Sequence, residues 1–306
     1  MKHQPIIDEP LTAGNVSEAI GFVRAANPFA QHVWGWDTGR FVDFRWGSNN
    51  IRADWDSEWF ERHCRVFRSG RQIAAIAIAE EGNEYECILT TGPDPELVTE
   101  IMARRMAAHR ELGVGISLEF TREEDWLREV CRQAGLSEQD DTGREWEYDL
   151  QVVDTEIVVP DGYETTTLRE RPNLDRAAIA KCVERSFDTS VDLEPVMRNL
   201  EQNPMSLPEL SSVVLAPDGS VAAYCRGTVD PVSGVCGIDP VCTDPDHQRL
   251  GLGKTAVRQL FANQRALGGR FAYIGSAPPP APGTFLYRSL GPSRELVGCA
   301  WSGGAT

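Results

Sequence analysis

The sequence predicts an α+β fold built from two similar domains in tandem. β-hairpins alternate with amphipathic helices along the chain, which is typical of sheets covered by helices. The first half also repeats in the second, because Leu112-Gly113 at the end of one long helix recurs as Leu267-Gly268, at an offset of 155 residues. A chain of 306 residues has room for two domains, which we expect at residues 1–152 and 153–306.

In the first half, the spacing of apolar residues predicts a helix, then a β-hairpin, then helices and strands in alternation. The hairpin turns at Ser69-Gly70, and Gly92-Pro93-Asp94-Pro95 separates the third strand from a long helix. We expect helices at residues 17–26, 97–112 and 123–134, and strands at residues 64–68, 72–79, 84–89, 114–120 and 145–150.

Residues 31–46 hold three of the eight tryptophans of the chain. Aromatic side chains at this density could line a substrate cleft, because their rings supply large contact surfaces. They could also form an ordinary core seam or a dimer contact. We expect the core seam, which is the commoner use of such residues.

The two halves meet at residues 151–163, where Pro160-Asp161-Gly162 predicts a turn and the preceding valines indicate a strand. The second half then repeats the alternation, with a hairpin at Pro217-Asp218-Gly219. We expect strands at residues 164–168, 207–215, 221–229, 235–243 and 271–275, helices at residues 174–187, 194–200, 254–261 and 285–291, and a final strand.

Residues 248–253 join a strand to a helix through Gly251 and Gly253. Glycines at a helix entrance let a ligand approach the backbone, and the free N–H groups and the positive end of the helix dipole attract anions. Arg249 and Lys254 flank the turn and either add direct charge or simply decorate the helix. We therefore expect a diphosphate site here.

Two other phosphate-binding motifs do not fit this turn. A P-loop ending in Gly253-Lys254-Thr255 requires a glycine where Gln248 stands. A dinucleotide fingerprint requires the strand to run straight into the glycines and an acidic residue about 20 positions later, and residues 271–276 offer none.

The run from Gln248 to Gly253 resembles the signature of the GCN5-related N-acetyltransferase (GNAT) family: Gln or Arg, two residues, Gly, one residue, then Gly or Ala. Residues 285–291 resemble the Leu-Tyr-x-x-x-Gly helix of that family, and the resemblance spans residues 163–301. It implies that each domain is a three-layer α/β/α unit with a mixed, mainly antiparallel sheet flanked by helices. It also implies the tandem two-domain type, similar to the acetyltransferases of mycothiol biosynthesis.

The resemblance implies acetyl-CoA, or another acyl-CoA, as the co-substrate. In the family, the end of the central strand lies beside the pantetheine arm, and the following loop binds the diphosphate. The matching residues are Val241, Cys242 and Thr243 for the pantetheine, and Gln248, Arg249, Leu250, Gly251, Leu252, Gly253, Lys254 and Thr255 for the diphosphate. Nothing in the sequence pairs Cys242 with a base, so we expect a core thiol and not a nucleophile.

Tyr287 matches the tyrosine that serves many family members as general acid for the coenzyme thiolate. A phenol is protonated at neutral pH and can donate to a thiolate, but Tyr287 could also serve only to pack its ring. Asp239 lies near the position of a glutamate base in other members, and it either accepts the amine proton or caps a bulge before Pro240. His247 and an ordered water are the other candidates for the base.

The first copy lacks the glycines of the loop. At the offset of 155 residues, Gly251 and Gly253 face Glu96 and Val98. A carboxylate at this position would repel a diphosphate. We therefore expect the first domain to be a degenerate copy, kept for packing or for shaping the substrate site.

Composition narrows the class of partner. With 46 acidic and 30 basic side chains the net charge is −16, which argues against a nucleic-acid partner and suits either a cationic substrate or plain solubility. The eight cysteines form no CxxC pair and lie in apolar runs, so we expect buried thiols and no metal site. Without a signal pattern or a long apolar stretch, we expect a cytoplasmic protein with no membrane partner.

The resemblance to the GNAT family implies an N-acetyltransferase that transfers the acetyl group of acetyl-CoA to the amine of a small molecule, by direct attack in a ternary complex. Two alternatives stay open: a protein that binds or senses acyl-CoA without catalysis, and a transferase of a longer acyl group. We expect a monomer or a homodimer.

Overall fold

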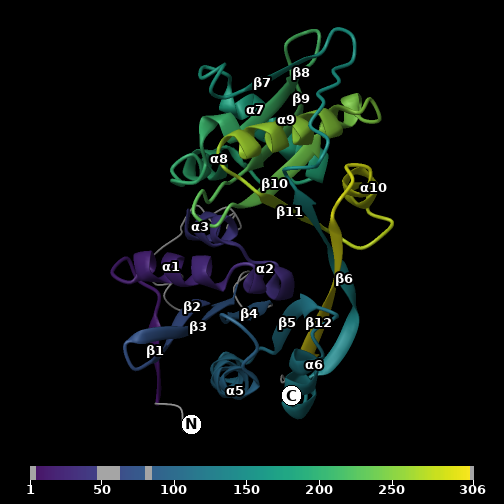
Figure 1. The fold of residues 1–306 in the computed structure, drawn as a ribbon. Coiled ribbons are helices and arrows are strands. Elements are labelled where there is room, and N and C mark those ends of the chain that lie inside the picture. The colour runs from purple at the N-terminus through teal and green to yellow at the C-terminus, as the bar shows by residue number, and fades with distance from the viewer. Residues whose placement is uncertain (1–4, 47–62, 80–84, 304–306) are drawn as a thin grey trace.

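A computed structural model describes residues 5–46, 63–79 and 85–303 of the chain (Figure 1). In this part of the chain, strands form one 12-stranded sheet in the order β1-β2-β3-β4-β5-β12-β6-β11-β10-β9-β8-β7. The first half of the chain forms most of one end of this sheet, and the second half forms the other end. The structure thus confirms the predicted α+β class, with mixed strand pairing and flanking helices.

The strands and helices have the following bounds. The strands are β1 (Ile6–Pro10), β2 (Cys64–Ser69), β3 (Gln72–Ala79), β4 (Glu86–Leu89), β5 (Ile116–Thr121), β6 (Ser137–Asp149), β7 (Glu164–Thr167), β8 (Ser211–Leu215), β9 (Val221–Gly227), β10 (Val235–Thr243), β11 (Phe271–Ser276) and β12 (Arg294–Gly303). The helices are α1 (Val16–Ala26), α2 (Phe29–Trp34), α3 (Thr38–Trp46), α5 (Pro95–Glu111), α6 (Asp125–Gln133), α7 (Arg176–Phe187), α8 (Glu194–Leu200), α9 (Leu252–Ala266) and α10 (Pro282–Arg288). Two short 3-10 turns are η1 (Pro208–Leu210) and η2 (Pro245–His247).

β6 and β12 exchange places between the two halves. β6 closes the first half yet pairs antiparallel with β11, whereas β12 closes the chain yet pairs antiparallel with β5. The two strands also pair with each other, and Figure 1 shows them running together between the upper and lower parts of the molecule. β6 begins at Ser137, well before the predicted residue 145, because β12 pairs along it. The boundary at residues 152 and 153 stays a prediction, and the strands on its two sides interleave.

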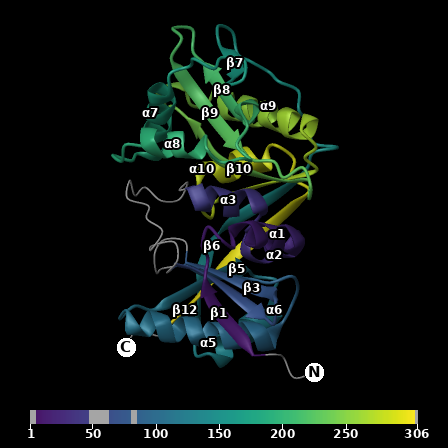
Figure 2. The ribbon, with the colours of Figure 1, turned by 90° about the vertical axis from the view of Figure 1, so that its left-hand side faces the viewer.

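Helices α7 and α9 cover opposite faces of the sheet in the second half (Figure 2). Neighbouring residues of β9 divide between two core clusters, since side chains alternate along a strand. Ala223 and Cys225 pack with Phe261 of α9, and Tyr224 packs with Ile179 of α7. This gives the second half its three layers.

The structure confirms the internal repeat and its register. Strands β5 and β11 begin and end 155 residues apart, and helices α5 and α9 end 155 residues apart. Each helix is followed by a glycine with a left-handed backbone, Gly113 at φ 73° and Gly268 at φ 93°. Both copies therefore use the same helix ending, which only glycine adopts without a steric cost.

The strand predicted within residues 151–163 is wrong. This segment runs along α9, where the Thr255 hydroxyl donates to the Val158 carbonyl at 2.6 Å and Arg258 donates to the Glu156 carbonyl at 2.9 Å. Val152 and Val158 are 79% and 60% exposed. Val153, by contrast, is buried, but the segment forms no strand because α9 supplies the hydrogen bonds that a neighbouring strand would have made.

The aromatic stretch forms α2, α3 and the turn between them. Trp34 and Trp36 are buried, and each packs edge-on against a phenylalanine, Trp34 on Phe120 at 5.7 Å and Trp36 on Phe44 at 5.6 Å between ring centroids. Core packing is thus confirmed for these two tryptophans. Both also border a cavity that is described below.

Helix α3 fastens the first half to the second. Gly39 packs so closely on Thr228, the residue after β9, that a Cβ at this position would lie 2.0 Å from the Thr228 hydroxyl oxygen. Asp43 accepts two hydrogen bonds from the buried guanidinium of Arg226, at 2.7 and 3.0 Å, and a further one from Asn203. Both side chains of this bidentate ion pair are buried. Removing either one would leave the charge of the other buried without a partner, which is costly.

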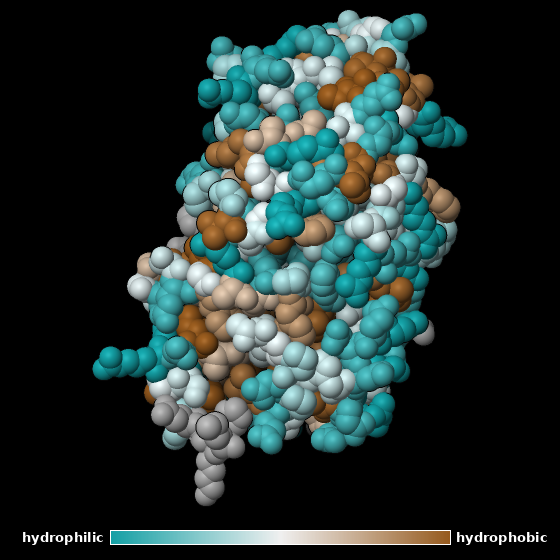
Figure 3. Space-filling view, in the orientation of Figure 1, coloured by the Kyte–Doolittle hydropathy of each residue, from teal (hydrophilic) through white to brown (hydrophobic). Residues whose placement is uncertain are grey.

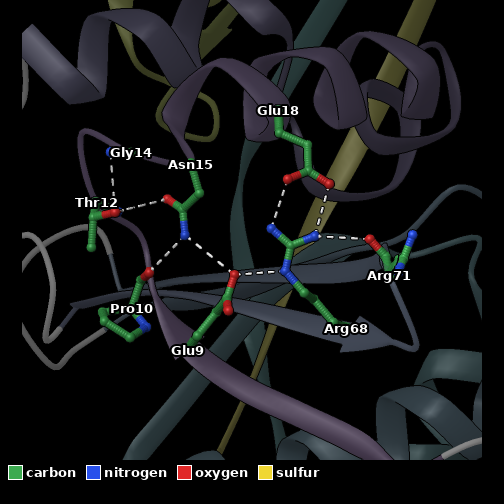
Figure 4. A network of polar contacts seen from close by, with 8 residues as sticks. All are labelled: Glu9, Pro10, Thr12, Gly14, Asn15, Glu18, Arg68 and Arg71. Carbon is green, nitrogen blue, oxygen red and sulfur yellow. Dashed lines mark hydrogen bonds and ion pairs between the residues drawn. The ribbon is translucent and has the colours of Figure 1, made fainter.

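A polar network ties the N-terminal strand to the first helix (Figure 4). Arg68 of β2 donates to Glu9 of β1 at 2.6 Å and forms two bonds of 2.7 Å with Glu18 of α1. Asn15 adds a bond of 3.0 Å to the Pro10 carbonyl. Arg68 of β2 and Asn15, the residue before α1, therefore both hold the edge strand β1 in place.

The face drawn in Figure 3 is mainly hydrophilic, with scattered apolar patches, as expected for a net charge of −16. Over the described ranges, every helix falls short of the length and apolarity that crossing a bilayer requires.

Candidate functional site

Strands β10 and β11 separate halfway along their length. They pair in parallel only from Val235 to Gly237; farther along, within the described residues, β10 pairs with β9 and β11 pairs with β6. A register shift between Ile238 and Val241 places a β-bulge where the two strands part. The backbone N–H and C=O groups on the facing edges of β10 and β11 therefore have no partner strand in the described part of the chain. An extended ligand can form hydrogen bonds with them, as an additional strand would.

The loop that follows β10 is open to solvent. Gln248 to Gly251 are exposed, and Gly251 begins α9 with a left-handed backbone, φ 82°, and no atom within 4 Å of where its Cβ would lie. Among the described residues, none accepts a hydrogen bond from the backbone N–H of Gly251, Leu252, Gly253 or Lys254. Four free amides at the positive end of a helix form a site for an anion.

Contacts around this loop hold it in place. Gln248 donates to the Thr243 carbonyl at 3.3 Å, and the Lys254 ammonium donates to the Ser289 carbonyl at 2.8 Å. A Cβ at Gly253 would lie 3.1 Å from the Thr243 hydroxyl oxygen. The two glycines are therefore needed for different reasons, Gly251 for its backbone conformation and Gly253 for close packing of the helix on β10.

The remaining predicted loop residues have distinct environments. Arg249 and Leu250 form the tip, where Arg249 has a positive φ of 63° and Leu250 is 47% exposed. Thr255 points inward and donates to the Val158 carbonyl, so its hydroxyl is already used. Val241 is partly buried against the core beneath α9.

Cys242 is a core thiol, as predicted. It is 4% exposed, and its sulfur lies 3.8 Å from that of Cys182 on α7. The hydrogen bond between the two thiols and burial raise the pKa of Cys242 well above its ordinary value. A thiol that resists ionisation is a poor nucleophile. All eight cysteines of the chain are buried free thiols.

Tyr287 both packs its ring and leaves its hydroxyl unpaired. The ring is 6% exposed and lies 5.2 Å from that of Trp146, and the Tyr148 hydroxyl donates to the Tyr287 carbonyl at 2.8 Å. Burial raises the pKa of the Tyr287 phenol, and the nearby Cys225 and Asp239 raise it further. No described residue forms a hydrogen bond with this hydroxyl, which is a protonated donor at neutral pH.

Asp239 lies in the bulge of β10, directly before Pro240. Its side chain is exposed, while its carbonyl accepts a hydrogen bond of 3.3 Å from Arg226. Ile238 and Val241 pack against the same core, which shows that the bulge breaks the alternation of the strand. Asp239 still acts electrostatically on Tyr287. Its role as a base stays a prediction.

A cavity of about 270 Å³, the splay cavity, lies where β10 and β11 part. Asp239 of β10 and Tyr273 of β11 line it together with Asp37, Arg40 and Glu145 from the first half. Burial raises the pKa of Asp37 to about 6 and that of Glu145 to about 8, although Arg40 opposes both shifts. Two carboxyls with raised pKa values, beside strand edges that lack a partner strand among the residues described, are typical of a functional site.

Asp37 and Glu145 were not among the site residues predicted from the sequence. Both come from the first half, one from the turn before α3 and one from β6, the strand that crosses to β11. The sequence offers only a weak signal for them, an acidic residue within the aromatic stretch and another on the closing strand.

The equivalent helix entrance in the first half has no free anion site. Asp94 precedes α5, and its carboxylate accepts a hydrogen bond of 3.0 Å from the backbone N–H of Leu97. Pro95, the first residue of α5, has no N–H to offer, and Glu96 adds negative charge. The expected degeneracy of this copy therefore has a direct physical basis.

The paired three-layer halves, the parting strands and the open glycine loop define the class of tandem acyltransferase folds. Residues 178–291 match the model of the acetyltransferase (GNAT) family. The second half of the chain is therefore a GNAT domain, and the chain as a whole has the tandem GNAT fold.

Solved structures with this fold cover nearly the whole chain. A GCN5-related N-acetyltransferase from Sphaerobacter thermophilus is 14% identical with a TM-score of 0.66, covering 98% of this chain and 96% of its own. A tandem GNAT protein from the clavulanic acid biosynthesis pathway is 13% identical with a TM-score of 0.67, covering 99% of both chains. No curated protein sequence matches the chain. The similarity at these identities shows the fold.

Proposed function

We propose that this chain is an acyl-CoA-dependent N-acetyltransferase that moves an acetyl group from acetyl-CoA to the amine of a small molecule. The observation that carries the proposal is the row of free amides from Gly251 to Lys254, presented at the N-terminus of α9 beside parted β-strands. This arrangement fits a ligand with a diphosphate at one end and an extended, amide-containing arm at the other.

The donor would bind along β10 and the loop after it. The amides of Gly251 to Lys254 would hold the diphosphate, and Arg249 would add charge at the exposed tip. The free backbone edge of β10 at Val241 to Thr243 would pair with the pantetheine amides. The acyl carbon would then lie near the bulge, between Asp239 and the hydroxyl of Tyr287.

Transfer would proceed by direct attack. The nitrogen of the acceptor amine bonds to the thioester carbon, the carbon–sulfur bond breaks, and the sulfur leaves with the bonding electrons. The Tyr287 hydroxyl gives a proton to the departing thiolate, and the amine loses a proton to Asp239 or to a water beside it. The products are an amide and the free coenzyme thiol, so atoms and charges balance.

Calorimetry and a thiol-release assay test the proposal. We expect the purified chain to bind acetyl-CoA and to release the coenzyme thiol only when an amine is present. Binding without amine-dependent release would indicate an acyl-CoA sensor, and faster release from a longer acyl-CoA would indicate a different donor. Absence of binding to any acyl-CoA would refute the donor site.

A further inference from the structure

A second cavity, the aromatic cavity, adjoins the splay cavity. It measures about 300 Å³ and lies where β4 and β5 of the first half part after pairing at a single position, Glu86 with Leu118. The two cavities share the lining residues Gly35, Arg40, Glu145 and Gly275. They are therefore neighbours, and Glu145 lies at their common wall.

The wall of the aromatic cavity suits a ring-bearing ligand. Trp34, Trp36 and Phe120 line it, and the Arg40 guanidinium lies 4.5 Å from the Trp36 ring centroid. Trp34 is only 4% exposed, yet no described residue accepts a hydrogen bond from its indole N–H. This N–H also has almost no surface open to solvent, so it lies behind the wall of the cavity and out of reach of a ligand.

The common wall of the two cavities favours a cation. At Gly35 a Cβ would lie 3.6 Å from a Glu145 carboxylate oxygen and 3.5 Å from an Arg40 guanidinium nitrogen, so the missing side chain leaves room between these groups. Asp37 and Asp239 also face the splay cavity, so three carboxyls face one guanidinium. Asp43 also borders the splay cavity but is already neutralised by its buried pair with Arg226.

We propose that the first half of the chain forms the acceptor site: the ammonium of an arylalkylamine binds between Asp37 and Glu145, and its ring lies in the aromatic cavity. This inference rests on the proposed function and names its acceptor class. The amine would then stand at the point where β10 and β11 part, next to Asp239. The degenerate half would determine which amine is acetylated.

Three amines test the substrate class on the full chain. Tyramine carries an aromatic ring and the amine, L-tyrosine adds only a carboxylate, and glucosamine replaces the aromatic ring with a hydroxylated sugar ring. We expect kcat/KM with acetyl-CoA to be at least tenfold higher for tyramine than for either of the others. A bound ammonium lowers the raised pKa values of Asp37 and Glu145, and the two ionised carboxylates then repel the carboxylate of L-tyrosine. A preference for L-tyrosine or glucosamine would overturn the inference.

The variant Glu145→Gln tests the site itself. It keeps the shape of the side chain and can still accept the hydrogen bond from Gln31. We expect KM for tyramine to rise at least tenfold, while the Kd of acetyl-CoA stays within twofold. The control Asp149→Asn removes a carboxylate from the same strand, outside both cavities, and should change neither value. An unchanged KM in Glu145→Gln would overturn the inference.

A direct binding measurement separates this inference from the proposed function. Calorimetry of tyramine with the chain alone requires no donor, so it is informative even if acetyl-CoA does not bind. Weaker tyramine binding in Glu145→Gln than in the wild type supports the acceptor site whatever the donor. Equal binding in both proteins, or none in the wild type, would overturn it, while acetyl-CoA binding in the same samples would leave the proposed function intact.

Discussion

The two halves of this chain share one fold but differ at the entrance of a single helix. In the second half, α9 begins at a left-handed glycine with free amides above it, whereas in the first half Asp94 occupies the equivalent helix entrance of α5 with its own carboxylate. The strands next to each helix part in both halves, so the opening is a property of the fold. Which ligand the opening suits depends on a few residues at the helix N-terminus.

The first prediction concerns how firmly the two halves are joined. Asp43→Ala leaves the Arg226 guanidinium buried without its carboxylate, which should cost about 3–5 kcal/mol of unfolding free energy. Urea denaturation measures this loss. As a control, Asp8→Ala removes a carboxylate that pairs with Arg65 in a more exposed position, and should cost about 1 kcal/mol or less. Similar losses in the two variants would contradict a rigid junction between the halves.

The second prediction converts the donor loop into the acidic form of the first half. Gly251→Glu places a carboxylate among the free amides and should weaken acetyl-CoA binding by about a hundredfold, through charge repulsion and blocked amides. Calorimetry measures the Kd. Gly268→Glu is the matched control, because Gly268 also has a left-handed backbone and open space, but lies at the other end of α9. Equal losses in both variants would assign the effect to backbone strain.

The third prediction separates binding from chemistry. Tyr287→Phe retains the ring that packs on Trp146 but removes the unpaired hydroxyl. We expect kcat to fall about a hundredfold, the lower end of the usual contribution of a general acid, with the Kd of acetyl-CoA unchanged. Wild-type turnover in this variant would show that the hydroxyl takes no part in the reaction.

The fourth prediction concerns the pH dependence of stability at the common wall. The folded pKa of Glu145, about 8, lies above its ordinary value of 4.5, so the wild type loses stability as the pH rises from 4.5 to 8. Glu145→Gln cannot titrate. Its stability relative to the wild type should therefore grow over this range, by about 1–2 kcal/mol after allowance for solvent in the cavities, and then level off.

Urea midpoints at pH 5, 7 and 8.5 check this prediction. The groups that act on Glu145 are Arg40 on α3, Asp37 before it, Gln31 on α2 and Glu147 on β6. Asp37 also has a raised pKa, about 6, and it titrates in both proteins, so its contribution largely cancels in the difference. Parallel pH profiles for the two proteins would mean that Glu145 is already ionised at pH 5.

Much of this architecture could be predicted from local sequence. The long helix α5 and the hairpins are local patterns, since apolar spacing and glycine or proline turns depend on neighbouring residues. The repeat is found by comparing two such patterns 155 residues apart. The open loop at Gly251 was predictable for the same reason, because a left-handed glycine at a helix entrance has a local cause. The valines of residues 151–163 led to a wrong strand prediction. Which of their side chains are exposed depends on how the segment lies along α9, and not on its neighbours in the sequence.

By itself, the sequence determined the fold class and the glycine loop that would accept a diphosphate, because both follow from residues close together in the chain. It also determined the tandem arrangement, because local patterns of the first half recur 155 residues later. Only the tertiary structure decided that β6 and β12 cross between the halves, and that Asp37 and Glu145 of the first half face Asp239 of the second. Strand order and cavity lining depend on contacts between residues far apart in sequence, and no periodicity in the chain encodes them.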